Sequence, residues 1–238
     1  MIGVFDSGNG GKSVLREIVK ILPEEKYVYY ADTAHCPYGE KTREYVVSRA
    51  VEITRLLLGK GADIIVVACN TATAAAIADL RRLWPSVPFV GIEPAVKPAA
   101  LGSRSSAIGV LATKGTLAGS NYLDLRDKYS EKVRIVQRVG EGFVELVEAG
   151  ILEGPEAEAV VRRAVEPLLE EGADTIVLGC THYPFLKDTI QKIVGPGVRI
   201  IDPAPAVARQ VARLYTPRLD GPSTEYLSSL VDGGSARI

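Results

Sequence analysis

An internal repeat constrains the fold of this chain more than any other feature of its sequence. The segment GADIIVVAC, which ends at Cys69, returns as GADTIVLGC, which ends at Cys180, so the spacing is 180 − 69 = 111 residues. Two weaker matches keep the same order, at spacings of 109 and 106 residues: residues 91–95 with 200–204, and residues 2–5 with 108–111. Three ordered matches at similar spacing predict that the chain contains two copies of one unit.

Each copy is predicted to fold as an α/β lobe. The run Ile64–Ala68 is β-branched and shows no polar alternation, which is typical of a parallel strand buried on both faces. Such runs alternate with stretches of helical hydrophobic spacing, which predicts two mostly parallel sheets flanked by helices. The expected helices are 14–22, 43–58, 71–83 and 154–171, and the expected strands are 3–5, 28–31, 64–68, 107–111, 134–136, 175–178 and 198–201.

The two lobes are expected to have a cleft between them. We expect residues 1–95 to form the first lobe, completed by residues 206–238, and residues 96–205 to form the second. Clefts between lobes and the carboxyl ends of parallel strands are favoured ligand sites, so the active site is expected there, with one cysteine from each lobe. Regular structure is expected to break at residues 216–222, and the last residues, from Asp232, are expected to fray.

Composition excludes several classes of partner and location. The net charge of −1 favours neither nucleic acid nor an anionic membrane surface. No apolar run is long enough for a transmembrane helix, and the first residues lack the pattern of a signal peptide, so a cytoplasmic protein is expected. Three cysteines, a small and odd number, predict thiols rather than a disulfide framework.

The first repeated cysteine stands where a thiol can act as a base. Cys69 ends a predicted strand, and a helix is expected to begin just after it, with Asn70 and Thr71 at its start. The positive end of a helix dipole and its backbone N–H groups favour a thiolate and also attract a carboxylate. The alternative is a buried, inert cysteine beside an ordinary helix cap, and this motif alone does not decide between the two.

The second repeated cysteine is expected to repeat this geometry, with a strand before it and a helix after it, and it is accompanied by a histidine. The chain has two histidines, and His182 follows Cys180 by two residues. Its imidazole can hydrogen-bond the thiol or a substrate carboxylate, or carry a proton. A lone histidine is more often structural, but its place beside a cysteine at a strand end favours a functional role.

The turn after the first predicted strand is rich in glycine. Its sequence, DSGNGG, starts at Asp6 and lets the backbone approach a ligand closely, while the Asp6 carboxylate can orient a thiol or hold a substrate ammonium group. Nucleotide binding is not expected here. A P-loop ending at Ser13 would need glycine in place of Asp6, and a dinucleotide fingerprint would need glycine in place of Ser13.

The loop after the second predicted strand, residues 32–41, is polar. Tyr38 and Gly39 can close over a ligand from this loop. His35 and Cys36 are adjacent, but adjacent residues seldom chelate one ion, and no CxxC or HxxxH spacing supports a metal site. We therefore expect no metal, and for these two residues either structural roles or roles in supporting the residues that contact a ligand.

Taken together, these motifs resemble those of the glutamate racemases. The resemblance extends from the start of the chain to about Val211. Any one segment is a weak match, but the ordered set is specific. The segments that carry it are residues 6–11, residues 32–34 with 37–39, residues 69–72, and residues 180–184.

The resemblance implies a cofactor-independent interconversion of L- and D-glutamate. One thiolate removes the α-proton while the opposite thiol delivers a proton to the other face; Cys180 would act on L-glutamate and Cys69 on D-glutamate. Asp6 is implied as the partner of Cys69, and His182 as the partner of Cys180. The implied substrate contacts are Asp6, Ser7, Tyr38, Gly39, Asn70, Thr71, Thr181 and His182.

The resemblance also implies a biological role and an assembly. The D-glutamate product would supply peptidoglycan synthesis, and hence cell wall biogenesis and cell shape, and members of the family are often homodimers. Lys12, residues 137–141 and Pro203 depart from the family pattern, whereas Glu148 matches a carboxylate near the site.

Other functions stay open at this level. An aspartate racemase usually carries glutamate at the position of His182, and some decarboxylases and isomerases of the superfamily keep one cysteine, whereas both are present here. A binding protein without activity would be expected to lose a catalytic cysteine. A thiol redox enzyme would be expected to carry a CxxC motif, and the chain has none.

Overall fold

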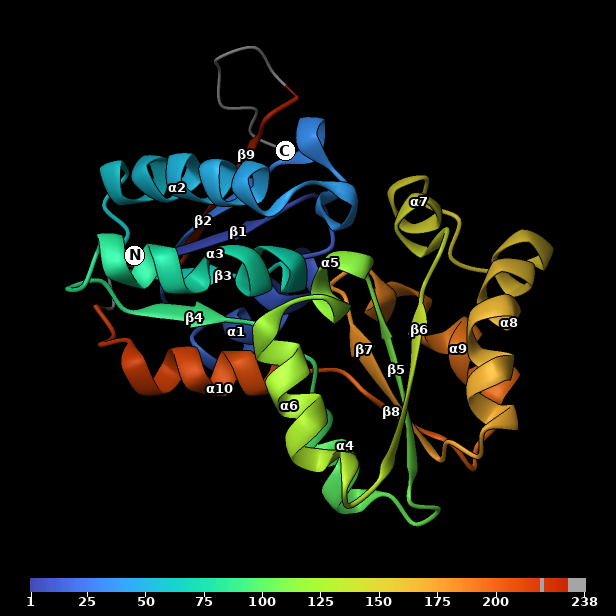
Figure 1. Ribbon diagram of the computed structural model, residues 1–238. Helices are drawn as coiled ribbons and strands as arrows, with labels where there is room; N and C mark the ends of the chain where they lie inside the picture. Colours follow the sequence, from blue (N-terminus) through green and yellow to red (C-terminus); the bar gives the residue numbers. More distant parts are fainter. Residues whose placement is uncertain (219–220, 231–238) are drawn as a thin grey trace. The chain divides into compact units, whose positions relative to one another are not determined.

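The computed structural model describes residues 1–218 and 221–230 and divides into two compact units. The first unit is Met1–Ile92 with Ala204–Ile238, and the second is Glu93–Pro203 (Figure 1). The fraying expected after Asp232 concerns residues outside the described part of the chain.

The first unit is built on a parallel sheet with the strand order β4-β3-β1-β2-β9. The central strands are buried along their whole length, as their continuous apolar runs predict. The strands are β1 (Ile2–Asp6), β2 (Lys26–Ala31), β3 (Ile64–Val67), β4 (Phe89–Gly91) and β9 (Ser223–Ser228).

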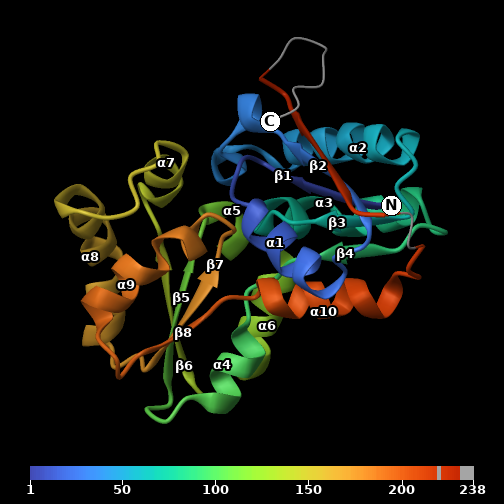
Figure 2. The same ribbon diagram turned by 180° about the vertical axis from the view of Figure 1, so that it is seen from behind.

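Helices cover both faces of this sheet (Figures 1 and 2). α1 (Lys12–Ile21) and α10 (Ala204–Leu214) pack on one face, and α2 (Arg43–Gly59) and α3 (Asn70–Leu83) pack on the other. Two short 3-10 turns, η1 (Thr33–His35) and η2 (Tyr38–Glu40), connect β2 to α2. Successive side chains along each strand point to opposite faces of the sheet, so they pack into two separate apolar layers.

The second unit repeats this plan with a parallel sheet of order β6-β5-β7-β8. α4 and α6 lie on one face, and α8 and α9 lie on the other (Figure 1). The strands are β5 (Ala107–Ala112), β6 (Arg134–Val139), β7 (Thr175–Gly179) and β8 (Arg199–Ile201). The helices are α4 (Val96–Gly102), α5 (Lys114–Leu117), α6 (Ser120–Ser130), α7 (Phe143–Glu148), α8 (Pro155–Glu170) and α9 (Lys187–Val194), with a 3-10 turn η3 (Tyr183–Leu186).

The two sheets correspond strand by strand, as a duplication predicts. β4-β3-β1-β2 in the first unit matches β8-β7-β5-β6 in the second. The register agrees too, because Ile2 pairs with Ile64 and Ile108 pairs with Thr175, and these are equivalent positions of the two copies. The prediction of two parallel sheets flanked by helices is confirmed.

The strand β9 was not predicted. Its sequence, STEYLS, is short and polar and follows a segment that proline and glycine interrupt, so no periodicity reveals it. It pairs in parallel with β2, where Tyr226 lies opposite Tyr29, and it forms the edge of the sheet. Its stability comes from this long-range pairing rather than from local propensity.

The repeated Gly-Ala-Asp motif has a structural role at Asp174. This carboxylate accepts hydrogen bonds from the backbone N–H groups of Arg104 (2.5 Å) and Ser105 (2.7 Å) and from the hydroxyls of Ser103 (2.9 Å) and Thr175 (3.0 Å). Burial alone would raise the pKa of Asp174, but these hydrogen bonds outweigh it and lower the pKa to about 2. The carboxylate thus ties the loop before β5 to the start of β7.

Replacing Asp174 by asparagine is expected to destabilise the protein by roughly 1 to 3 kcal/mol at pH 7, since several hydrogen bonds to a charged group are weakened. A lowered pKa stabilises the fold above the unfolded value near 3.9, and this contribution disappears as the pH falls through about 2. The difference between the two proteins in urea unfolding should therefore shrink on acidification. Asp127→Asn, at a carboxylate 66% exposed, is the matched control and should be nearly neutral.

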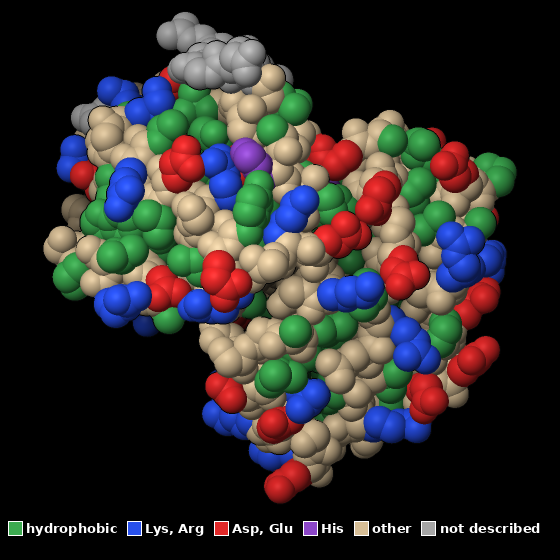
Figure 3. All heavy atoms as spheres, turned by 45° about the horizontal axis from the view of Figure 1, so that its top comes forward, with side chains coloured by type: hydrophobic (Ala, Val, Ile, Leu, Met, Phe, Trp, Pro, Cys, Tyr) green, Lys and Arg blue, Asp and Glu red, His purple; other side chains and the backbone are tan. Residues whose placement is uncertain are grey.

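Charged side chains of both signs are interspersed over the face drawn in Figure 3, in keeping with the net charge of −1. Within the described part of the chain, no helix is both long and apolar enough to span a bilayer.

Candidate active site

Cys69 lies between β3 and α3 and is the N-cap of that helix. Its Sγ accepts a hydrogen bond from the N–H of Ala72 (3.4 Å), and it lies 3.7 Å from the Oγ of Ser7. The residue is 5% exposed. A thiolate at this position is stabilised by the helix dipole and by the N–H donor, as the sequence predicted.

The turn after β1 reaches the thiol through Ser7. Asp6 is fully buried, and its carboxylate accepts the N–H of Gly8 (2.9 Å), while the hydroxyl of Tyr29 donates to the carbonyl of Gly8 (2.8 Å). These bonds fix the shape of the turn, so Asp6 orders the backbone that carries Ser7. A further residue, Gly11, lies so close to the Asp6 side chain that an added Cβ would clash with it.

The side chain of Asn70, the first residue of α3, is buried but forms no hydrogen bond with the described residues. It is 3% exposed, and neither its amide nitrogen nor its amide oxygen has a hydrogen-bond partner among the described residues. A buried side-chain amide normally finds partners, because leaving it unpaired costs about 1 to 3 kcal/mol. The unpaired donor and acceptor beside Cys69 are the groups that a polar ligand would satisfy. Thr71 is buried next to it.

Tyr38 lies in the same buried cluster as Cys69. It is 1% exposed, and its hydroxyl donates to the Oδ2 of Asp32 at 2.5 Å. Burial, and then the negative charge of Asp32, raise the pKa of Tyr38 far above its usual value, so the phenol keeps its proton. Gly39 follows it and is half-buried.

Cys180 follows β7 in the second unit and has a different setting from Cys69. It is 8% exposed, and its Sγ lies 3.8 Å from the Nδ1 of His182. The sequence predicted the same strand–cysteine–helix geometry twice, but here the strand leads into the 3-10 turn η3, and α9 begins only at Lys187. Pro184 in this turn has no N–H to donate, so the chain does not form a regular α-helix at once.

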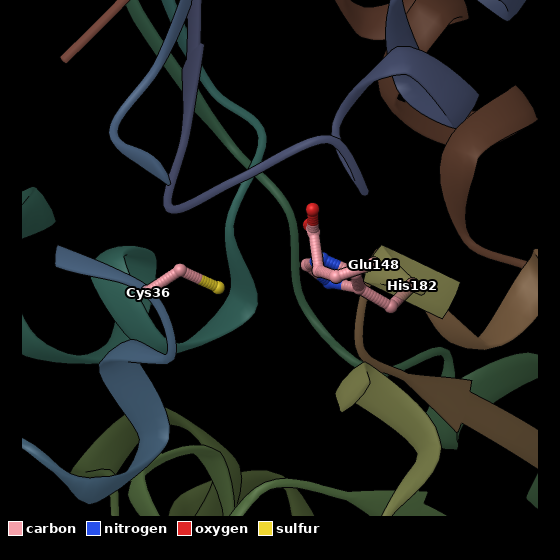
Figure 4. Close-up of side chains that lie close together, drawn as sticks. All are labelled: Cys36, Glu148 and His182. Carbon is pink, nitrogen blue, oxygen red and sulfur yellow. The ribbon is translucent and has the colours of Figure 1, made fainter. Parts of the chain in front are cut away.

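His182 is held by a carboxylate on a neighbouring helix. Its Nε2 lies 2.6 Å from the Oε1 of Glu148 at the end of α7. Figure 4 shows the side chains of Glu148 and His182 next to each other. His182 is 1% exposed and Glu148 is half-buried. Because Nε2–H donates to the carboxylate, Nδ1 is left facing the thiol of Cys180. Glu148, which the resemblance placed near the site, therefore contacts the histidine directly.

Tyr183 and Thr181 complete the surroundings of Cys180. The Tyr183 hydroxyl donates to the carbonyl of Gly140 (3.3 Å), and its ring packs edge-on against Phe143. Burial, and then the charge of Cys180, raise the pKa of Tyr183 well above its usual value, so it remains a neutral phenol. Thr181 is buried as well. Cys180 is thus followed by buried residues in this turn.

All three cysteines are thiols, and Cys36, which Figure 4 also labels, lies half-buried after η1 in the first unit. The Nδ1 of His35 lies 2.5 Å from the hydroxyl of Tyr45.

Comparison with known proteins decides the family. The profile of the Asp/Glu/Hydantoin racemases matches residues 2–211. The chain belongs to this family. Among racemases of this family, the glutamate racemase of Ectopseudomonas mendocina is 53% identical over 90% of this chain and 81% of its own. That of Pseudomonas aeruginosa strain PAO1 is 49% identical over 91% of this chain and 82% of its own. The resemblance drawn from the sequence motifs is confirmed.

Solved racemases of the family share the fold. Escherichia coli glutamate racemase, solved with L-glutamate and the activator UDP-MurNAc-ala, has a TM-score of 0.87 and 34% identity over 98% of this chain and 90% of that chain. The enzyme of Francisella tularensis, solved with D-glutamate, has a TM-score of 0.83 and 27% identity over 96% and 87%. The aspartate racemase of Picrophilus torridus, at a TM-score of 0.56 and 17% identity over 90% and 93%, shares only the fold.

Proposed function

We propose that the chain interconverts L- and D-glutamate without a cofactor, by two-base proton transfer between Cys69 and Cys180. The observation that carries the proposal is Asn70, whose buried amide offers a donor and an acceptor to a ligand directly beside a helix-capping thiol. Its relatives at about half identity are glutamate racemases. Inversion by proton transfer needs an acid and a base on opposite faces of the α-carbon, and two equivalent strand ends supply one thiol each.

Cys180 is assigned to L-glutamate. As a thiolate it takes the α-proton, and the electron pair of the C–H bond is left on the substrate as a carbanion-like state. His182 lies within reach of the thiol, at 3.8 Å, and Glu148 holds its ring from the far side at 2.6 Å. When the imidazole is neutral, its Nδ1 accepts a hydrogen bond from the thiol of Cys180. When Nδ1 has taken the proton of that thiol, the imidazolium, whose Nε2–H is held by Glu148, stabilises the thiolate.

Cys69 is assigned to D-glutamate, from which its thiolate removes the α-proton. In the conversion of L- to D-glutamate, Cys69 acts as the acid. Its thiol delivers a proton to the other face of the α-carbon, and the thiolate that remains is held by the N–H of Ala72 and the start of α3. Asp6 shapes the turn that brings Ser7 to the thiol. After one turnover the two sulfurs have exchanged protonation states, and reaction of the other enantiomer restores them.

The substrate's polar groups match the polar groups around the two thiols. We assign its contacts to the residues named from the sequence: Asp6, Ser7, Tyr38, Gly39, Asn70, Thr71, Thr181 and His182. Asn70 can pair with both an ammonium and a carboxylate, and the α3 N-terminus favours a carboxylate. The developing negative charge is stabilised by hydrogen bonds in a site that excludes water.

The assembly and the biological role belong to the same proposal. The two lobes, residues 1–95 with 206–238 and residues 96–205, contribute one thiol each. The protein acts in the cytoplasm as a homodimer, and its D-glutamate supplies peptidoglycan synthesis and so cell wall biogenesis and cell shape.

Racemisation by the purified protein tests this function. Protein dialysed against a chelator is incubated with L-glutamate or L-aspartate, and both enantiomers are separated by chiral chromatography. We expect D-glutamate to accumulate and aspartate to remain unchanged. Conversion of aspartate alone would assign the chain to another racemase activity, and conversion of neither amino acid would mean that the polar groups at Asn70 serve binding without catalysis.

A further inference from the structure

A buried ion pair lies behind the Tyr38 loop. Asp32 is fully buried at the end of β2, and Arg49 on α2 binds both of its oxygens, with Nε to Oδ2 at 2.9 Å and Nη2 to Oδ1 at 2.8 Å. The third arm of the guanidinium, Nη1, reaches Glu52 at 2.6 Å. A bidentate pair of this kind fixes the plane of the carboxylate as well as its charge.

The same carboxylate holds Tyr38. The phenol donates to Oδ2 of Asp32, the oxygen that also accepts the Nε–H of Arg49. Tyr38 opens η2, which packs against α3, the helix that Cys69 caps. The chain of contacts therefore runs from Arg49 through Asp32 and Tyr38 to the surroundings of the thiol.

The loop that carries Tyr38 is held near its start by other contacts, where the N–H of Ala34 donates to Ser229 Oγ (2.9 Å) and His35 Nδ1 lies 2.5 Å from the Tyr45 hydroxyl. Residues 33–35 and 38–40 form two single 3-10 turns, and Tyr38 is the buried residue in them. Short 3-10 turns have poor hydrogen-bond geometry and are weakly stable alone. A fixed acceptor for the Tyr38 hydroxyl thus constrains where the second turn, η2, sits.

We propose that Arg49 is a positioning residue, which orients Asp32 so that the Tyr38 hydroxyl and the η2 turn are held in place beside Cys69. Arg49 contacts no reacting atom and acts only through this route. The inference rests on the proposed function in one respect, the assignment of Tyr38 as a substrate contact. The geometry requires a guanidinium, because a lysine ammonium cannot bind both carboxylate oxygens in one plane.

A purely structural role for Arg49 makes a different prediction. A buried charge that loses its partner destabilises a fold as a whole, and global unfolding of the protein would expose Cys69 and Cys180 alike. A positioning role is local and runs through the Tyr38 hydroxyl. It should therefore vanish when that hydroxyl is removed.

The test is a double-mutant cycle of Arg49→Gln and Tyr38→Phe, read by alkylation of the cysteines. Full-length protein is treated with iodoacetamide below saturation, and the peptides of Cys69 and Cys180 are quantified by mass spectrometry. Arg49→Gln is expected to speed modification of Cys69 about tenfold through local opening, with Cys180 unchanged as the internal reference. In the Tyr38→Phe background, Arg49→Gln should add no further increase.

Two matched variants sharpen the outcome. Glu52→Gln removes the other partner of Arg49 and should leave Cys69 as in the wild type. Arg49→Lys keeps the charge and should still speed modification, since it cannot hold both oxygens of Asp32. Full protection by lysine, or an equal increase for Arg49→Gln in both backgrounds, or equal increases at Cys69 and Cys180, would each overturn the proposal.

The alkylation readout does not depend on turnover. If the protein racemises no amino acid but gives the expected double-mutant cycle, the proposed function is contradicted and the positioning role of Arg49 is supported. Where glutamate is racemised, the same cycle is measured on kcat/KM, and the effect of Arg49→Gln on it should disappear in the Tyr38→Phe background.

Discussion

Cys69→Ser and Cys180→Ser are each expected to lower kcat/KM for glutamate by about 10³-fold, within the range typical of a lost general acid or base. A serine hydroxyl is a far weaker acid than a thiol, so neither variant has an alkoxide available to take the α-proton. L- and D-glutamate have equal free energy, so the loss must be the same in both directions for each variant. Chiral chromatography of initial rates measures it.

The third cysteine is the matched control for this experiment. Cys36 is a half-buried thiol that the proposed mechanism does not use, so Cys36→Ser should racemise glutamate at the wild-type rate. Circular dichroism should show all three variants folded, because serine is nearly isosteric with cysteine. Loss of activity in only one of the two catalytic variants would argue for a one-base mechanism instead.

His182→Asn is expected to lower kcat/KM by about 10²-fold, the second largest effect. Asparagine lacks the ring nitrogen that faces Cys180 at 3.8 Å, so the charge on the sulfur is no longer stabilised. Glu148→Ala should cost less, about tenfold, because the imidazole remains but is no longer held from Nε2. Glu148→Gln keeps an acceptor for Nε2–H and should fall between Glu148→Ala and the wild type.

Glu145 on the same helix provides the control for the glutamate variants. Its side chain is exposed, so Glu145→Gln removes one charge from α7 without touching His182 and should leave activity unchanged. Equal losses for Glu145→Gln and Glu148→Gln would point to the net charge of α7 rather than to the contact with the histidine.

Much of the fold was predictable because its strands have a strong local signal. The apolar runs at β1, β3, β5 and β7 mark buried parallel strands, and the repeat made the two sheets recognisable as copies. The strand β9 was not predicted because a polar edge strand gains its stability from a partner that is far away in the sequence. The α-helix expected directly after Cys180 failed for a local reason, since Pro184 imposes a 3-10 turn first.

Those residues of the site whose side chains are reactive or titratable could be predicted from the sequence. Cys69, Cys180 and His182 stood out by type and position, whereas the support behind them did not. Arg49 is one basic residue in a helix whose hydrophobic pattern is otherwise ordinary, and only the tertiary structure shows its guanidinium directed at Asp32. The sequence did contain one signal. Arg49 follows Val46 by three residues and precedes Ile53 by four, so its side chain lies on the helix face that packs against the sheet.

The isotopic composition of both enantiomers at early conversion tests the two-base account most directly. Wild-type protein is incubated with L-glutamate in deuterium oxide, and the reaction is stopped early. The enantiomers are separated, and the deuterium content of each is measured by mass spectrometry. The account predicts deuterium at the α-carbon of the D-glutamate product and protium in the remaining L-glutamate, with the mirror result starting from D-glutamate. Substrate protium retained in the product, or deuterium entering the unreacted enantiomer as fast as the product, would contradict it.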